Sequence, residues 1–160
     1  LRGFLEKEGF CIHGAHRFMP EFLLPEGSLG RVKPDKKLLA DIERGVAVVQ
    51  ALGALDIGQA AVVQQGHVLG VEAAEGTDAL IQRCAGLQRK GSGAVLVKLC
   101  KPDQDRDLDL PTIGLKTLEH VIEAGFAGIA GHAGQSFIVD KDAMKVLADK
   151  NKVFVSGIKA

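Results

Sequence analysis

The chain has 160 residues, enough for one domain with a buried core, and its 20 Lys plus Arg balance its 20 Asp plus Glu. This balance gives no general attraction to nucleic acid or to an anionic membrane. Trp and Tyr are absent, so the usual stacking platforms for single-stranded nucleic acid are missing as well. We therefore expect no nucleic-acid partner, and any charge chemistry must be local.

The three cysteines, Cys11, Cys84 and Cys100, are widely spaced, lie in apolar stretches and form no CxxC motif. This pattern is typical of reduced thiols in a cytosolic protein, and it argues against a disulfide framework or a zinc knuckle. The apolar runs are far shorter than the ~20 residues that a membrane-spanning helix needs. Any contact with lipid would therefore be peripheral.

The first residues read as the last turns of an amphipathic helix that ends at Gly9, followed by a strand-like run over residues 10–14. This helix begins without a cap, which is typical of a segment cut from a longer chain. We expect residues 1–15 to be the end of a truncated N-terminal α/β domain or its linker. Residues 16–160 would then form a C-terminal, catalytic-type domain that begins with a Pro- and Gly-broken surface connection.

Strands and helices alternate along the rest of the chain. Asp35 can cap a helix that runs to about Leu52. Two apolar runs around a Gln-Gly turn at residues 65–66 predict a hairpin. Residues 77–90 are expected to be helical.

The second half starts with a buried strand over residues 94–100. A helix is expected after Pro111, ending at Gly125, followed by a strand, a Gly-rich turn and another strand. Asp140 can cap the next helix, and residues 152–159 close the chain as a strand. The order predicts an α/β fold, or α+β, in a single domain with a mixed β-sheet flanked by helices.

The densest polar segment is the tract KPDQDRDLDLPTIG, residues 101–114, which has an aspartate at every second position from 103 to 109. If this tract were extended, its carboxylates would point to one side, where like charges repel. The spacing resembles the start of a calcium-binding loop, but that loop requires Gly and Glu where this chain has Leu108 and Gly114. We reject the calcium loop for this reason.

Two interpretations of the tract remain open. It is either a solvated loop screened by neighbouring cations or a ligand site. The ligand site is favoured by position, since the carboxyl end of a buried strand is where open α/β sheets hold ligands. Carboxylates there suit magnesium, which is commonly held by one or two carboxylates together with phosphate oxygens.

Other polar positions allow both a functional and a structural interpretation. Gly76 and Thr77 at a helix start can bind phosphate through backbone N–H groups and a hydroxyl, or can belong to a capping box near Glu75. Gln59 follows Asp56 and Gly58 in what is either part of a site or an ordinary helix-to-strand turn. His13, His16 and His132 lack the partners of a zinc motif.

Several blocks, in this order, are similar to the C-terminal domain of LpxI-type UDP-2,3-diacylglucosamine pyrophosphatases. They cover nearly the whole chain, and their sequences are LLPEGSLGR, LGALDIGQAAVV, VEAAEGTDALIQR, VLVKLCKPDQDRDLDLPTIGLKT, AGFAGIAGHAG and FIVDKDAM. The family tract has the pattern Q-D-x-R-x-D-L-P. This chain departs from it, because Asp107 occupies the arginine position and Arg106 stands one place earlier.

The resemblance implies Mg2+-dependent hydrolysis of UDP-2,3-diacylglucosamine to UMP and 2,3-diacylglucosamine 1-phosphate (lipid X) in lipid A biosynthesis. It also implies a cytoplasmic protein in peripheral contact with the inner membrane surface, with a smaller N-terminal domain ahead of this segment. We expect a homodimer from the apolar content and the cut boundary.

Site residues are implied by the same matches. The match to D-L-P-T-I-G places the essential aspartate at Asp109, with Asp105 second, both as metal ligands or water orienters. Lys98 and Lys101 would neutralise the leaving phosphate. The remaining substrate-binding positions are Gln59, Glu75, Gly76, Thr77, Asp78, Gln104, Arg106 and Thr112.

Two further questions stay open at this stage. The segment with Phe18, Met19, Phe22, Leu23 and Leu24 is either a lipid-facing loop or a surface that packs on the absent domain. The chain itself is either catalytic, a non-catalytic module that binds sugar nucleotide or lipid or forms an oligomer interface, or a purely structural domain.

Overall fold

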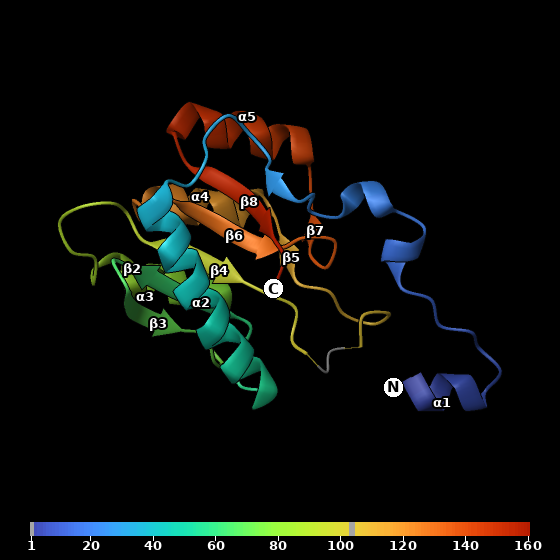
Figure 1. Ribbon diagram of the computed structural model, residues 1–160. Coiled ribbons are helices and arrows are strands. Elements are labelled where there is room, and N and C mark those ends of the chain that lie inside the picture. The colour runs from blue at the N-terminus through green and yellow to red at the C-terminus, as the bar shows by residue number, and fades with distance from the viewer. Residues whose placement is uncertain (1, 103–104) are drawn as a thin grey trace.

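A six-stranded mixed sheet forms the centre of the protein in a computed structural model that describes residues 2–102 and 105–160 (Figure 1). The helices and short 3-10 turns are α1 (Arg2–Lys7), η1 (Ala15–Arg17), η2 (Pro20–Phe22), α2 (Lys36–Ala54), α3 (Gly76–Ala85), α4 (Leu115–Glu123) and α5 (Lys141–Asn151). The strands are β1 (Gly27–Ser28), β2 (Ala60–Gln64), β3 (His67–Val71), β4 (Val95–Lys98), β5 (Thr112–Ile113), β6 (Gly128–His132), β7 (Phe137–Ile138) and β8 (Phe154–Ile158). The predicted α/β class with a mixed sheet is confirmed.

The strand order in the large sheet is β1-β8-β6-β4-β2-β3. Strands β4, β6 and β8 are parallel, with α4 and α5 in the connections that parallel pairing requires. Strands β2 and β3 form an antiparallel hairpin beside β4, and the two-residue β1 pairs antiparallel with β8. Strands β5 and β7 make a separate parallel pair. The carboxyl ends of β4, β6 and β8 therefore lie at one edge of the large sheet.

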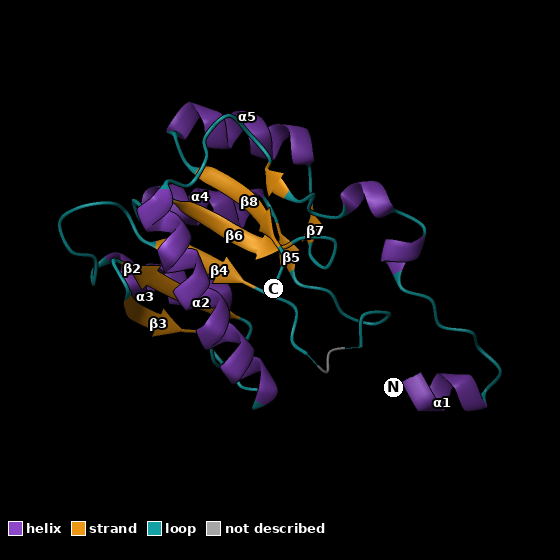
Figure 2. Ribbon diagram, in the orientation of Figure 1, coloured by secondary structure: helices purple, strands orange, loops and turns teal. Residues whose placement is uncertain are grey.

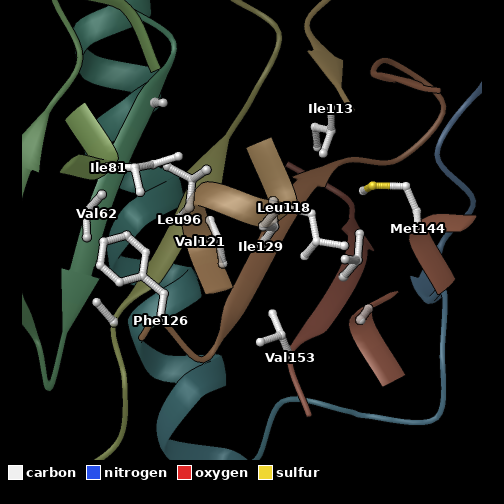
Figure 3. Close-up of a cluster of buried hydrophobic side chains, with 14 of the residues drawn as sticks. Val62, Ile81, Leu96, Ile113, Leu118, Val121, Phe126, Ile129, Met144 and Val153 are labelled. Carbon is white, nitrogen blue, oxygen red and sulfur yellow. The ribbon is translucent and has the colours of Figure 1, made fainter. Parts of the chain in front are cut away.

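Helices cover both faces of this sheet, as Figure 2 shows. Helix α2 packs on β2 and β4 on one face, while α3, α4 and α5 follow one another on the other face. Side chains alternate between the faces: Leu96 and Ile129 belong to the core under α3, α4 and α5, and Val97 and Ala130 belong to the core under α2. Figure 3 shows the first of these cores. Strands buried on both faces read as the continuous apolar runs seen in the sequence.

Helix α2 begins where the sequence predicts. The Asp35 side chain accepts hydrogen bonds from the backbone N–H groups of Lys37 and Leu38, both at 2.9 Å. The helix lies close to the sheet at Gly45, where a Cβ atom would collide with the Val97 side chain. A larger residue at Gly45 would push α2 away from the strands that it covers.

The predicted hairpin is confirmed, and its turn is tied to α2. Gln65 and Gly66 have φ of 51° and 76°, as a tight hairpin turn requires. Their N–H groups donate to the Asp41 carboxylate of α2 at 2.8 and 2.6 Å. Asp41 is buried, so its charge is held by the backbone groups of the turn.

Two predictions about local structure are wrong. Residues 10–14 are irregular and not a strand, because they have no pairing partner in either sheet. Helix α3 ends at Ala85 and does not reach residue 90. Over the described ranges, 2–102 and 105–160, no helix combines the length and the apolar character needed to cross a membrane.

Leu118→Ala should lower the free energy of unfolding by about 2–5 kcal/mol, because it leaves a cavity in the core of Figure 3. Leu118 is fully buried, whereas Leu87 is 50% exposed. Urea denaturation should therefore show a small change, within about 0.5 kcal/mol, for the control Leu87→Ala. Equal losses in the two variants would contradict the assigned core.

Candidate active site at the carboxyl edge of the sheet

Strand pairing brings separate polar segments to one edge of the sheet. Ala60 of β2 lies opposite Lys98 of β4, so the start of β2 meets the end of β4. The Gln59 carbonyl accepts from Leu99 N–H at 2.9 Å, and the Ala60 carbonyl accepts from Glu72 N–H at 2.8 Å. The residues before β2, after β3 and after β4 are therefore neighbours, as in ligand sites at the carboxyl edge of other α/β sheets.

Lys98 is the centre of this edge. Its residue is 8% exposed, and its Nζ donates to the Thr112 carbonyl at 3.2 Å. Burial lowers the pKa of the Lys98 ammonium, while the negative charges of Glu72, Asp78 and Asp109 act to raise it. The predicted residues Lys98, Asp78, Asp109 and Thr112 are thus gathered around one buried amine.

Glu72 is a site residue that was not assigned from the sequence. The residue is buried, and its Oε1 accepts from Thr77 Oγ1 at 2.6 Å while its Oε2 accepts from the Gln59 N–H at 3.1 Å. It therefore joins two predicted positions, Gln59 and Thr77. The available signal was a single carboxylate at the end of the apolar run that forms β3.

The side-chain amide of Gln59 has unused hydrogen-bonding capacity. Its Oε1 is buried and finds no hydrogen-bond partner within the described part of the chain. Buried acceptors are normally paired. The backbone N–H of the same residue is held by the Glu72 carboxylate.

Helix α3 begins at Gly76, whose φ of 80° is readily adopted by glycine. Its N-terminus has no side-chain cap, so the capping-box alternative is wrong. The Glu75 carboxylate instead accepts from Ala73 N–H at 3.1 Å and pairs with Arg83 at 2.7 Å. The Glu75 carboxylate is therefore occupied within its own segment.

Asp78 connects α3 with α4. Its carboxylate pairs with Lys116 Nζ at 3.0 Å, and it lies 3.3 Å from His120 Nδ1 without the angle of a hydrogen bond. The hydrogen bond with Lys116, chiefly, lowers the Asp78 pKa despite partial burial. Asp78 is therefore ionised at neutral pH and contributes to the negative potential around Lys98.

The described part of the aspartate tract is a helical turn and not an extended segment. Asp109 N–H donates to the Asp105 carbonyl at 2.9 Å, and Leu108 N–H donates to it at 3.0 Å. The expected alternation of side chains is therefore wrong for residues 105–109. Two of the tract positions, Asp103 and the predicted binding residue Gln104, lie outside the described residues.

Asp105 and Asp107 are held by the N-terminal segment. The Arg2 guanidinium donates to both Asp105 oxygens at 2.9 and 2.8 Å, and it keeps the Asp105 pKa below its ordinary value. Asp107 accepts from Gly14 N–H at 3.1 Å and pairs with Arg17 at 3.1 Å. Burial acts to raise the Asp107 pKa, but these contacts lower it overall.

The two remaining cationic residues that were predicted for the site, Lys101 and Arg106, lie on the other side of β4. Lys101 pairs with Asp56 at 2.6 Å. Arg106 is hydrogen-bonded to the Cys100 thiol, whose pKa is raised by burial and lowered in part by that contact. Asp109 also acts to raise the Cys100 pKa, so its charge influences groups on both sides of β4.

The described residues do not provide a complete set of metal ligands. Within residues 2–102 and 105–160, no three His, Cys, Asp or Glu side chains converge as ligands. Asp105 and Asp109 are nevertheless four residues apart on one turn, a spacing at which side chains are neighbours. A magnesium ion that retains water and binds substrate phosphate needs no larger set of carboxylates.

An apolar cleft of about 250 Å3 lies next to this edge, lined by Ala15, Met19, Phe22, Thr112, Phe137, Ile138 and Val139. Phe18 is 70% exposed and Phe22 43% exposed, whereas Leu24 is buried in the core. Thr112 connects the cleft with the Lys98 ammonium through its carbonyl. The segment from Phe18 to Leu24 therefore has an exposed part, with Phe18 and Phe22, and a buried residue, Leu24, that attaches it to the core.

A three-layered α/β domain with a buried lysine and three carboxylates at the carboxyl edge of parallel strands has the form of a ligand-binding enzyme domain. The chain belongs to the LpxI C-terminal domain family, whose model matches residues 25–156. It is 47% identical over 159 residues to the UDP-2,3-diacylglucosamine pyrophosphatase LpxI of Caulobacter vibrioides. That match covers 96% of this chain and 57% of the relative, so the chain spans little more than half of the relative's length.

Thr77→Val should destabilise the protein by about 1–3 kcal/mol, because the buried Glu72 carboxylate loses a hydroxyl donor. Thr117→Val on α4 is a suitable control, since the Thr117 hydroxyl makes no hydrogen bond within the described residues. Chemical denaturation of both variants measures the difference. A Thr77→Val variant as stable as the control would mean that this hydrogen bond contributes little.

Arg2→Gln should raise the Asp105 pKa toward its ordinary value, as measured by 13C NMR titration of the carboxyl carbon. Arg2 stabilises the ionised form, so its contribution to stability is present above the ordinary pKa and is lost as pH falls through the lower, folded value. Lys7→Gln, also on α1, should leave the Asp105 titration unchanged. An unchanged pKa in Arg2→Gln would show that the contact does not persist in solution.

Proposed function

We propose that this protein hydrolyses the diphosphate of UDP-2,3-diacylglucosamine, the molecule in the name of its relative, to UMP and 2,3-diacylglucosamine 1-phosphate in lipid A biosynthesis. The observation that carries this proposal is the buried Lys98 ammonium, on which the charges of Glu72, Asp78 and Asp109 act, in a chain of the LpxI C-terminal domain family. The proposed site residues all lie within residues 16–160, the expected catalytic-type domain.

The cationic part of the site would receive the diphosphate. Lys98 is buried, and its nearby carboxylates favour its charged form. A fixed ammonium in a partly dehydrated site stabilises negative charge that develops on phosphate oxygens. The unpaired Gln59 oxygen and the Thr77 hydroxyl held by Glu72 would position the substrate from the other side.

Hydrolysis requires water to attack one phosphorus atom while the bridging P–O bond breaks. The Asp109 carboxylate would orient this water by accepting a hydrogen bond from it. Lys98 would neutralise the phosphate that leaves with the bridging oxygen. Asp78, ionised by its contact with Lys116, would keep Lys98 charged.

Asp109 and Asp105 would hold Mg2+ together with phosphate oxygens, and this ion would supply positive charge to the diphosphate. Asp105 must exchange its Arg2 partner before it can bind a metal. Because both partners are exposed to solvent, which weakens an ion pair, this exchange requires little free energy.

The apolar cleft would serve the acyl part of the substrate. Met19, Phe22 and Val139 line it next to Thr112, and all four residues are exposed. A surface that packs against another part of a longer protein would have the same apolar lining. Cytoplasmic location, peripheral contact with the inner membrane and a homodimer stay predictions.

Asp109→Asn should reduce the hydrolysis of UDP-2,3-diacylglucosamine at least about 100-fold, because the substitution removes the charge but keeps the size. The control Asp142→Asn removes an exposed carboxylate on α5 and should retain activity. Release of UMP measures the rate. Unchanged turnover in Asp109→Asn would reject this site.

Magnesium binding provides a readout that is independent of turnover. Saturating MgCl2 with UMP should raise the thermal midpoint of the unsubstituted chain, and Asp109→Asn should lose the metal-dependent part of this rise. Nucleotide binding without hydrolysis by the unsubstituted chain would instead support the non-catalytic binding module.

A further inference from the structure

The apolar cleft beside the sheet edge has two sides of different construction. One side is formed by β5, by β7 and by the residue that follows β7, all in the body of the domain. The other side is formed by Ala15, Met19 and Phe22 of the N-terminal segment, which Figure 1 shows outside the layered body. We call residues 14–22 the cleft wall. None of the residues 15–22 is buried, so little apolar packing holds the cleft wall in place.

The two ends of the cleft wall are attached in different ways. Leu24, two residues after the wall, is buried in the core, and Leu23 forms a bridge with Phe137 of β7. The other end, at Gly14, contacts Asp107 of the aspartate tract. Apolar burial therefore fixes one end, and a polar contact fixes the other.

Asp107 binds the start of the cleft wall through both of its carboxylate oxygens. Oδ1 accepts from the Gly14 N–H at 3.1 Å and lies 3.1 Å from Arg17 Nε, while Oδ2 accepts from Arg17 Nη2 at 3.1 Å. The Asp107 side chain is 11% exposed, so these contacts are partly shielded from water. A two-point contact between a guanidinium and a carboxylate fixes their orientation as well as their distance. Ala15, between Gly14 and Arg17, is thereby held against the tract.

The backbones of the wall and the tract approach closely at this contact. A Cβ atom on residue 14 would lie 2.9 Å from the Asp107 Cα and 2.5 Å from the His16 ring, which is closer than real Cβ contacts. Glycine is therefore needed at position 14 for steric reasons, although its φ of −67° is open to any residue. The absence of a side chain allows the Gly14 N–H to reach the carboxylate.

Asp107 also lies inside the turn that carries Asp109. The Asp107 N–H donates to the Asp105 side chain at 3.1 Å, and the Asp109 N–H donates to the Asp105 carbonyl at 2.9 Å. These hydrogen bonds set the position of Asp109 relative to Asp107. Asp107 therefore connects the cleft wall with the Asp109 turn.

This connection does not depend on the contact between Arg2 and Asp105. Arg2 Nη1 lies 2.8 Å from Asp105 Oδ2 and 3.4 Å from Asp107 Oδ2, so Asp105 is its closer partner. If Asp105 releases Arg2, as the proposed function requires, Gly14 and Arg17 still bind Asp107. The cleft wall then stays attached while Asp105 changes its partner.

We propose that Asp107 is a positioning residue, which holds the cleft wall and the Asp109 turn as one unit. Its effect on turnover rests on the proposed function. A substrate that extends from the cleft to the Asp109 turn then meets both parts at a fixed separation, and a small displacement of a reacting group is costly in rate. Asp107 acts through other residues, because its carboxylate is occupied by Gly14 and Arg17.

The two methionines of the chain report separately on the wall and on the core. Met19 lines the cleft, and Met144 is fully buried. In 13C-methyl NMR spectra of the 160-residue chain, Asp107→Ala should move the Met19 signal toward that of an unfolded methionine and leave the Met144 signal unchanged. The control Glu43→Ala removes an exposed carboxylate on α2 and should leave both signals unchanged. A Met19 signal that stays in place in Asp107→Ala, or a Met144 signal that moves with it, would overturn the proposal.

A steric variant tests the same contact with every charge retained. Gly14→Ala should displace the cleft wall, because the new Cβ meets the Asp107 backbone, and the Met19 signal should move as it does in Asp107→Ala. Gly3→Ala is the control, since a Cβ there meets nothing within 4 Å. An unchanged Met19 signal in Gly14→Ala would show that the two backbones do not approach closely, and it would overturn the proposal.

Hydrolysis of UDP-2,3-diacylglucosamine tests whether the connection serves the reaction. Asp107→Ala should lower kcat/KM at least about 10-fold while the Met144 signal stays unchanged. Arg17→Gln should also lower kcat/KM, and adding it to Asp107→Ala should cause little further loss, because both substitutions remove one contact. Glu43→Ala should retain full activity. Full activity in Asp107→Ala, or independent losses that multiply in the double variant, would overturn the positioning role.

The two proposals fail separately. Turnover that is lost in Asp109→Asn but retained in Asp107→Ala would keep the proposed function and reject the positioning role. Turnover that persists in Asp109→Asn, with a Met19 signal that depends on Asp107, would reject the proposed function and keep Asp107 as the residue that positions the cleft wall.

Discussion

A buried ammonium group at the end of a central strand constrains the whole carboxyl edge of this sheet. Lys98 loses hydration, and three carboxylates from three separate segments offset that loss. Glu72 comes from the end of the hairpin, Asp78 from the start of α3 and Asp109 from the loop after β4. Their convergence requires β2 to be antiparallel to β4, because only that direction returns the end of β3 to the same edge. The sheet topology is thus a condition for the charge balance.

Most of the fold could be predicted because its signals are local. Asp35 marks a helix start by its own side-chain chemistry, and a Gln-Gly turn between apolar runs predicts a hairpin without knowledge of any other segment. The run at residues 10–14 has the composition of a strand but no partner, and pairing is a property of the whole sheet. Composition alone does not show that this run lacks a strand to pair with.

For the candidate site, the local pattern indicated only the polar segment that follows a buried strand. Asp109 itself was implied by the resemblance, through the D-L-P-T-I-G match. Glu72 was missed because its approach to Thr77 and Gln59 depends on the register of the hairpin. The contact of Asp105 with Arg2 joins residues 103 positions apart, and no local pattern indicates it.

The aspartate turn shows how close carboxylates are accommodated without a long strand. Asp105 and Asp107 pair with arginines of the N-terminal segment, while the charge of Asp109 acts on the Lys98 ammonium. Figure 1 shows this loop reaching from the end of β4 toward α1, away from the layered body. Asp105 and Asp107 share Arg2, and Asp107 also pairs with Arg17, so nearby cations reduce the mutual repulsion of the carboxylates.

The buried Asp41 carboxylate has a mechanical consequence. By binding both N–H groups of the hairpin turn, it fastens the far end of β2 and β3 to α2. Removing such a buried contact is costly, whereas the Arg2–Asp105 ion pair that helps to fasten the aspartate turn is exposed and weak. The scaffold beneath the ligand is consequently stiff, and adjustment to an incoming molecule falls to the loop after β4 and to the N-terminal segment. The hairpin turn is therefore the rigid end of β2 and β3, and the edge of the sheet at which β4 ends is the adaptable one.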